Sequence, residues 1–267
     1  MSLSPPAEWL ELAIDLARRG GEALRAAAAT GAAGRAELKG ARELVTEADR
    51  ASERIVVGGL RDALPDHGIC AEEGVFPASV AAEDAEWVWY VDPLDGTANF
   101  VHSIPFYAVA IGLVHRGVPV LGVVHAPLLG ETYAARQGAG AQCNGAPIRV
   151  SETRDLGAAM LATGLAYRRD EPQQDDNVVR LARVLPRCRD VRRLGSAQLD
   201  LCLTACGRLD GYWELELAPY DVVAGAAIVR EAGGRVTDLR GGEDWWRGYI
   251  LASNGALHDA LLVEVGG

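Results

Sequence analysis

Four short β-patterns follow one another between residues 87 and 136, and they constrain the fold more than any other part of the chain. They cover residues 87–92, 106–115, 118–126 and 131–136. Each is rich in Val, Ile, Trp or Tyr and is broken from the next by Gly or Pro. The pattern predicts consecutive strands joined by hairpin-like links.

Helical patterns precede these strands. Residues 7–29 place apolar side chains near a helical period, and two prolines stand just ahead, where a helix tolerates them. The Gly-rich, polar residues 30–43 predict a loop. We expect a second helix over residues 47–63.

The second half of the chain alternates between strand and helix patterns. We expect helices at 172–185, 196–206 and 220–232, and strands at 158–164, 190–194, 210–215 and, as a pair, within 234–252. The sequence contains no repeat of fixed period and no low-complexity tract or long linker. It therefore predicts a mixed α/β sandwich of the α+β type with two sheets, in a single domain over residues 1–267.

Composition narrows the classes of function. Of the 267 residues, 49% are hydrophobic, which is enough for a large core. The formal net charge of -11 disfavours nucleic acid or an anionic membrane as the main partner. The N-terminal residues do not resemble a secretory signal, and no apolar run approaches the roughly 20 residues that span a bilayer. We expect a cytoplasmic protein without a membrane partner.

The five cysteines are scattered without CxxC spacing, which argues against a disulfide framework and a zinc site. We expect reduced thiols without a function at Cys70, Cys143, Cys188, Cys202 and Cys206.

The segment "DPLDGT" (92–97) is the strongest candidate for chemistry. By composition it is a turn. However, an apolar strand brings Asp92 to its C-terminal end, and Gly96 with Thr97 opens a helix whose free backbone amides can hold an anion. Aspartyl-phosphate phosphatases place two Asp residues two apart. Here Asp92 and Asp95 are three apart, which favours metal binding.

Other acidic residues occupy similar places. Glu72 and Glu73 follow a short apolar run, Asp221 opens a helical pattern, and Asp49 lies three residues after Thr46. Each has a structural alternative. Asp49 can complete a capping box, and Asp221 can be an ordinary acidic residue that the helix dipole stabilises near a helix N-terminus. The glutamates can be solvated. Their joint occurrence favours a site. Oxygen ligands select hard cations such as Mg²⁺.

Four segments together resemble the inositol monophosphatase family of magnesium-dependent, lithium-sensitive phosphatases. They are "ELVTEAD" (43–49), "AEEG" (71–74), "WVWYVDPLDGTANFVHSIPF" (87–106) and "APYDVVAGAAIVREAGG" (218–234). Similarity extends to "RRLGSAQLDL" (192–201) and "GRLDGYWE" (207–214). The resemblance implies a layered α-β-α-β-α sandwich of the inositol monophosphatase and fructose-1,6-bisphosphatase type. It also implies lobes of about 1–150 and 151–267, and a homodimer.

The resemblance also implies a metal site for two to three Mg²⁺ ions. Glu72, Asp92 and the carbonyl of Leu94 would bind the first ion, and Asp92, Asp95 and Asp221 the second. Glu72 would help to hold a weaker third ion. These cations would reverse the local field, so that an acidic protein can bind an anionic substrate.

Roles for the remaining site residues follow from the same resemblance. Thr97, with Glu72, would position the attacking water, and Asp49 would support Thr97. The amides of Gly96 and Thr97 would receive the phosphate. The substrate alcohol would contact Asp95, Gly195, Ala197 and Glu214.

The implied reaction is hydrolysis of a phosphate monoester, first of all inositol 1-phosphate, by a metal-activated water and without a covalent phosphoenzyme. Histidinol phosphate, fructose 1,6-bisphosphate and nucleotide 3'-phosphates are alternative substrates. A non-catalytic metal-binding regulatory protein is the alternative from a different class. Ser196 is expected to cap a helix and His102 to pack. Tyr220 stands where the family usually has Trp, and Arg168 or Arg169 could reach a second anionic group.

Overall fold

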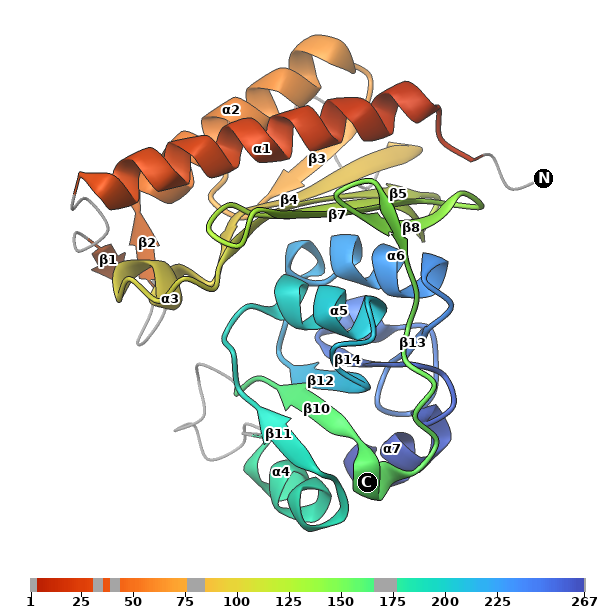
Figure 1. Cartoon of the computed structure of the whole chain (residues 1–267). Helices are drawn as coiled ribbons and strands as arrows, with labels where there is room; N and C mark the ends of the chain where they lie inside the picture. The colour runs from red at the N-terminus through yellow and green to blue at the C-terminus, as the bar shows by residue number, and fades with distance from the viewer. Residues whose placement is uncertain (1–3, 31–35, 39–43, 76–84, 166–176, 267) are drawn as a thin grey trace.

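The chain is described by a computed structural model over residues 4–30, 36–38, 44–75, 85–165 and 177–266. Layers of helices and sheets alternate through the molecule, with helices outermost at both ends (Figure 1). The predicted layered α-β-α-β-α sandwich with two sheets is confirmed.

The larger sheet has seven strands, and their order in the sheet follows the order in the chain. β3 runs parallel to β4, and each later pair of neighbours is antiparallel, as the hairpin pattern predicts. The strands are β3 (Gly68–Ala71), β4 (Trp87–Asp95), β5 (Ala108–His115), β6 (Val118–Ala126), β7 (Glu131–Arg136), β8 (Gly140–Cys143) and β9 (Ala146–Ile148).

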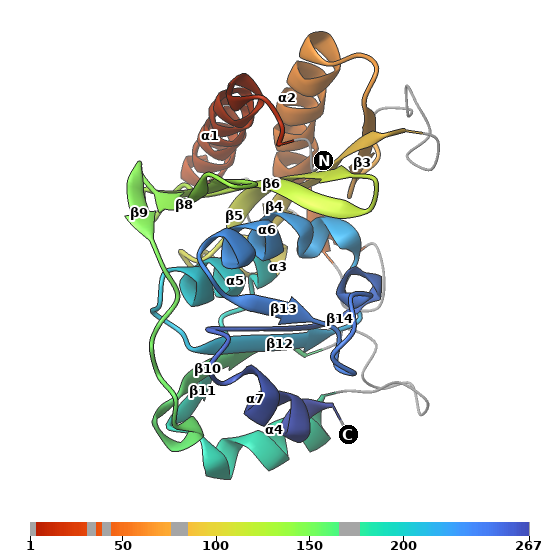
Figure 2. The same cartoon turned by 90° about the vertical axis from the view of Figure 1, so that its right-hand side faces the viewer.

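Two long helices, α1 (Ala7–Ala29) and α2 (Glu47–Ala63), cover the outer face of this sheet (Figure 2). Both have the predicted bounds. Leu16 of α1 and Trp89 of β4 are fully buried in the core between the layers. Burial of each large apolar side chain contributes about 1.5–3 kcal/mol. The predicted loop between the helices contains strand β1 (Ala36–Leu38), which pairs with β2 (Leu44–Thr46).

The smaller sheet has five strands in the order β11-β10-β12-β14-β13. These are β10 (Met160–Thr163), β11 (Asp190–Arg192), β12 (Gly211–Leu215), β13 (Arg235–Thr237) and β14 (Tyr249–Ser253). Helices α5 (Ala197–Ala205) and α6 (Val223–Glu231) lie between the two sheets, and α4 (Val178–Val184) and α7 (His258–Val265) cover the outer face (Figure 1). The short elements are α3 (Thr97–Val101) and the 3-10 turns η2 (Leu156–Ala158), η3 (Leu185–Arg187), η4 (Pro219–Asp221) and η5 (Trp245–Arg247).

Two glycines let α6 lie directly on the larger sheet. A Cβ atom on Gly122 of β6 would be 2.1 Å from the carbonyl oxygen of Ala224, and one on Gly112 of β5 would be 2.6 Å from Val223 Cγ1. Only glycine permits this approach. The contact places the residues just before α6, including Asp221, near the end of β4.

The secondary-structure predictions for the second half hold except at a few boundaries. The helix expected over 220–232 is a 3-10 turn followed by α6, which begins at Val223. Residues 172–176 of another expected helix, and Arg168 and Arg169, lie outside the described residues. The division into lobes near residue 150 stays a prediction. In the part of the chain that the structure describes, no helix has the length and apolarity needed to cross a membrane.

Candidate active site

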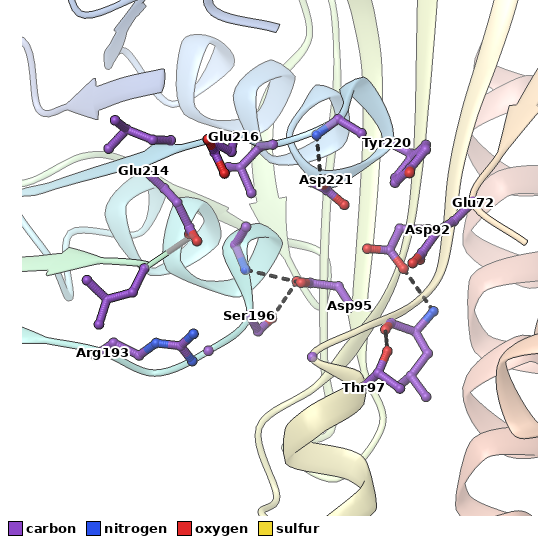
Figure 3. A pocket seen from close by; sticks show the side chains of 18 residues that line it. Glu72, Asp92, Asp95, Thr97, Arg193, Ser196, Glu214, Glu216, Tyr220 and Asp221 are labelled. Carbon is purple, nitrogen blue, oxygen red and sulfur yellow. Dashed lines mark hydrogen bonds between the residues drawn. The ribbon is translucent and has the colours of Figure 1, made fainter. Parts of the chain in front are cut away.

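A pocket of about 390 Å³ opens between the end of β4, the start of α5 and the chain that leads from β12 to α6 (Figure 3). Carboxylates dominate its wall: Glu72, Asp92, Asp95, Glu214, Glu216 and Asp221. The other predicted site residues that line it are Leu94, Gly96, Thr97, Gly195 and Ala197. Asp49 lies behind this wall.

The "DPLD" segment is a bulged strand end, so its prediction as a turn is wrong. Asp92 pairs with Ala110 of β5 and Asp95 with Ala108, so three steps along β4 match two along β5. A bulge inserts one extra residue of this kind, and it accommodates Pro93, which lacks an N–H group. In a regular strand, residues three apart face opposite sides. The bulge lets both aspartates line the pocket.

Asp95 connects the larger sheet to the first turn of α5. Its carboxylate accepts hydrogen bonds from Ser196 Oγ, from the Ala197 amide (3.1 Å) and from the Gln198 amide (2.8 Å). Ser196 is the N-cap of α5, as predicted. Burial raises the pKa of Asp95 to about 6, although these hydrogen bonds oppose the shift.

Gln198 is a buried residue that the sequence interpretation missed. Its side-chain Nε2 donates to the Tyr220 carbonyl, and its Oε1 accepts from the Gly225 amide, both at 2.7 Å. Since its own amide binds Asp95, Gln198 links the positions of Asp95 and Asp221. A buried glutamine in the first turn of a helix leaves no distinctive sequence signal.

The remaining acidic residues lie close to one another. Asp221 accepts a hydrogen bond from the Ala218 amide at 2.7 Å, and Asp92 accepts one from the Leu94 amide at 3.0 Å. Burial, and then the charges of Glu72, Asp95 and Asp221, raise the pKa of Asp92 well above its usual value. Burial and the charge of Glu72 likewise raise the pKa of Asp221. The ionised site is therefore self-repelling.

Thr97 and Asp49 form a hydrogen-bonded pair beside these carboxylates. Thr97 Oγ1 lies 3.2 Å from Asp49 Oδ1 and 3.0 Å from the Leu94 carbonyl oxygen. The other carboxylate oxygen of Asp49 accepts from Thr46, and the two residues complete a capping box on α2. Burial raises the pKa of Asp49. Asp49 therefore caps α2, as the structural alternative predicts, and also contacts Thr97.

Glu53 is a second residue that the sequence interpretation missed. This buried carboxylate on α2 accepts from the Glu73 amide at 2.8 Å and from the Val75 amide at 2.6 Å. It therefore holds the chain that follows Glu72. The helical periodicity of α2 gave no reason to separate Glu53 from solvated glutamates.

Glu214 lies at the end of the pocket away from Glu72 and Asp92 (Figure 3). It packs on Gly164, where a Cβ atom would be 1.8 Å from Glu214 Cδ, and it accepts a hydrogen bond from the Tyr212 hydroxyl. Burial raises the pKa of Glu214 to about 7, against the effects of Tyr212 and the positive charge of Arg193. Glu216, at the rim, has a left-handed backbone with φ 62°.

The donor chemistry of this pocket fits Mg²⁺. The ligands available are carboxylate and carbonyl oxygens, with neither thiol nor imidazole on the wall. In the described residues, no three acidic, histidine or cysteine side chains are already gathered tightly enough to hold an ion. Asp92, Asp95 and Asp221 instead bind backbone amides. Mg²⁺ retains several waters and needs only one or two carboxylates, so these residues fit it without a closed cage.

Two expectations outside the carboxylate group can be compared with the structure. His102, expected to pack, is exposed, because it follows α3 on the surface. All five cysteines are unpaired, as expected, and Cys202 is buried.

A family model described as "Inositol monophosphatase family" matches residues 6–266. The chain belongs to the inositol monophosphatase family. It is 40% identical over 257 residues to "Nus factor SuhB" of Vibrio cholerae, with 96% of this chain and 95% of the relative aligned. It is 42% identical to "Inositol monophosphatase 2" of Solanum lycopersicum, with 96% and 97% aligned. The solved inositol monophosphatase of Anabaena superposes with a TM-score of 0.86 at 39% identity, covering 96% and 94% of the two chains.

Proposed function

We propose that this member of the inositol monophosphatase family is a Mg²⁺-dependent phosphate monoester hydrolase. An inositol monophosphate is its first expected substrate. The observation that carries the proposal is the gathering of Glu72, Asp92, Asp95 and Asp221 beside the Thr97–Asp49 pair in one pocket. Buried carboxylates that repel one another are stable as anions only with compensating cations.

The same carboxylates are proposed to hold two to three Mg²⁺ ions. Glu72, Asp92 and the Leu94 carbonyl would take one ion, and Asp92, Asp95 and Asp221 another, with Glu72 helping to hold a third. Bound Mg²⁺ would neutralise the phosphate and the developing alkoxide, and would favour deprotonation of a water.

The chain's own residues would orient that water. The Thr97 hydroxyl has one proton and lies within hydrogen-bonding distance of Asp49 and of the Leu94 carbonyl. When Thr97 donates to either acceptor, its oxygen keeps lone pairs that would accept from a water that Glu72 also binds. Asp49 is thus a positioning residue, whereas Glu72 and Thr97 would touch the reacting atoms.

The phosphate would rest on the amides of Gly96 and Thr97. These N–H groups open α3 and have no acceptor within that helix, because the first amides of any helix lack one. Water would attack phosphorus in line with the alcohol oxygen. The Ser196 hydroxyl donates to Asp95, which supports a reaction without a phosphoserine.

The alcohol would occupy the other end of the pocket, against Glu214, Asp95 and the backbone of Gly195 and Ala197. Histidinol phosphate, fructose 1,6-bisphosphate and nucleotide 3'-phosphates are the competing substrates. We infer a homodimer from the family resemblance alone, and the cytoplasmic location stays a prediction from the sequence.

The Vibrio relative is named "Nus factor SuhB" and not a phosphatase, which keeps the second proposal, a non-catalytic metal-binding regulatory protein. The presence of every carboxylate that the chemistry needs, together with Thr97, favours the enzyme. The net charge of -11 disfavours direct binding of nucleic acid.

A phosphate-release assay over a panel of monoesters, with and without Mg²⁺, tests the proposal. We expect release that depends on Mg²⁺. Asp259→Asn, at an exposed side chain far from the pocket, is the control variant and should behave like the wild type. If millimolar Mg²⁺ supports no release from any ester, the chain is not this enzyme.

A further inference from the structure

The buried face of α2 is polar toward its N-terminal end and apolar toward its C-terminal end. The buried polar residues, Asp49, Ser52 and Glu53, come first, and beyond them the buried residues are Val56, Val57 and Leu60. A carboxylate is almost never fully buried unless its oxygens have partners. Glu53, which is only 1% exposed, therefore depends on its polar contacts.

Those contacts reach the chain directly after Glu72. Glu53 Oε2 accepts a hydrogen bond from the Glu73 amide at 2.8 Å, and Oε1 accepts one from the Val75 amide at 2.6 Å. Gly74 lies between the two donors and has φ 59°, a left-handed conformation that favours glycine. Convergent backbone N–H groups of this kind form an anion site, and here the anion is a side chain of the protein.

Glu72 is the first residue beyond β3, which ends at Ala71. Its amide still donates to the carbonyl of Val91 at 3.1 Å, next to Asp92. β3 is the edge strand of the larger sheet, and β4 is its neighbour there. Val91 therefore fixes the backbone at Glu72, and Glu53 fixes the backbone immediately after it.

The same helix also holds Thr97. Asp49 lies four residues before Glu53 on the buried face of α2, and its Oδ1 is 3.2 Å from Thr97 Oγ1. The two carboxylates thus contact the two parts of the chain that carry Glu72 and Thr97. These are the groups proposed to hold the attacking water.

We propose that Glu53 is a positioning residue for Mg²⁺ binding. By holding the backbone of residues 73–75, it directs the Glu72 carboxylate to the place where that group would bind a cation and the water. Glu53 is not among the described residues that line the pocket, so it acts only through Glu72. The inference rests on the proposed hydrolase function and adds to it a residue outside the pocket.

Two substitutions vary the number of hydrogen bonds from Glu53. Glu53→Gln keeps the volume and one acceptor oxygen, but turns an NH₂ group toward one of the two amides, whereas Glu53→Ala removes both acceptors. We expect the Mg²⁺ concentration for half-maximal phosphate release to increase about tenfold or more, because groups that orient a metal ligand have effects of this size. The increase should be larger for Glu53→Ala.

Two further measurements do not depend on turnover. The Mg²⁺ concentration that gives half of the rise in Tm should increase by a similar factor in both variants. In metal-free Glu53→Ala, hydrogen exchange at the Glu73 and Val75 amides should be faster than in the wild type, since both amides lose their acceptor. Exchange resolved by residue with NMR measures this.

Two neighbours on the buried face of α2 provide matched controls. Ser52→Ala removes a hydroxyl that has no hydrogen-bond partner among the described residues, and it should behave like the wild type. Val56→Ala leaves a cavity in the core and lowers Tm, but should leave the Mg²⁺ requirement unchanged. Circular dichroism verifies that each variant folds.

The outcomes separate the two proposals. A Mg²⁺ requirement in Glu53→Gln equal to that of the wild type, or an equal increase in Val56→Ala, shows that Glu53 only stabilises the fold and overturns the inference. The hydrolase then still stands if the wild type releases phosphate. Absence of release from every ester overturns the hydrolase, and the response of Tm to Mg²⁺ then decides on Glu53. If Tm of the wild type does not respond to Mg²⁺ either, both proposals are wrong.

Discussion

The hydroxyl of Thr97 has a single proton and two acceptors, Asp49 and the Leu94 carbonyl. Its oxygen is therefore oriented by Asp49, which lies behind the pocket wall, and by the Leu94 carbonyl. Asp49 is itself fixed by Thr46 at the start of α2. A short chain of hydrogen bonds thus extends from a helix cap to the position proposed for the attacking water.

Thr97→Val should lower kcat about 100-fold or more, because it removes the oxygen proposed to accept from the water at almost constant volume. Thr97→Ser retains the hydroxyl and should stay within about tenfold of the wild type. Steady-state phosphate release measures both. Equal activity of the Val and Ser variants would contradict the assignment.

Asp221→Asn removes the charge of a proposed metal ligand and preserves its hydrogen bond in the fold. Its amide oxygen can still accept from the Ala218 amide, whereas Asn at position 95 would turn an N–H group toward the donors of α5. We expect loss of activity and a higher Tm without metal, because a repelled, partly buried charge is removed.

The increase of Tm on adding Mg²⁺ should also shrink in Asp221→Asn. Thermal unfolding with EDTA and with Mg²⁺ measures both effects, and Asp259→Asn is the control. A Mg²⁺ response equal to the wild type would remove Asp221 from the ligand set.

At the level of elements, α5 connects the two halves of the site. Its first turn holds Asp95, and the Gln198 side chain ties it to the residues on both sides of Asp221. Helix α6, docked on Gly112 and Gly122, fixes the other end of this link. The separation between the acidic groups therefore depends on how the two helices pack.

Gln198→Leu should lower Tm by about 2–10 °C, because the buried Gly225 amide loses its acceptor at a cost of about 1–3 kcal/mol. It should also raise the Mg²⁺ concentration needed for half-maximal activity. Gln142→Leu makes the same change on β8, away from the active site, as a control. A lower Tm with an unchanged Mg²⁺ requirement would show that Gln198 only stabilises the fold.

Over the whole molecule, the acidic pocket makes stability depend on pH. The pKa of Asp95 is about 6 in the folded protein against 3.8 as its ordinary value, and those of Asp92 and Asp221 are also raised. The folded state then binds more protons than the unfolded state in this range. Stability therefore decreases as pH rises from about 4 through 6 and beyond.

The metal-free protein should accordingly have a higher Tm at pH 5 than at pH 8. Saturating Mg²⁺ should raise Tm at pH 8 by about 5–10 °C, since ligand at 100 times its Kd adds about 2.7 kcal/mol. The increase should be smaller at pH 5. Scanning calorimetry at matched ionic strength measures it, and a flat response to Mg²⁺ at pH 8 would contradict a cation-binding pocket.

The layers of the fold and the residues of the pocket could be predicted from the sequence, because apolar periodicity and acidic residues at strand ends are local signals. It assigned "DPLD" to a turn, since a bulge depends on the register with β5, which a single strand does not reveal. Gln198 and Glu53 were missed for a related reason. Their importance comes from distant backbone amides that only the folded chain brings near.

The glycine contact between β6 and α6 has a consequence for protein synthesis. Glu72, Asp92 and Asp95 leave the ribosome long before Asp221, and they form one pocket with it only after α6 settles against Gly122. A nascent chain that contains only the larger sheet therefore lacks part of the pocket wall. Activity of the proposed hydrolase would thus require a chain that has been synthesised through α6.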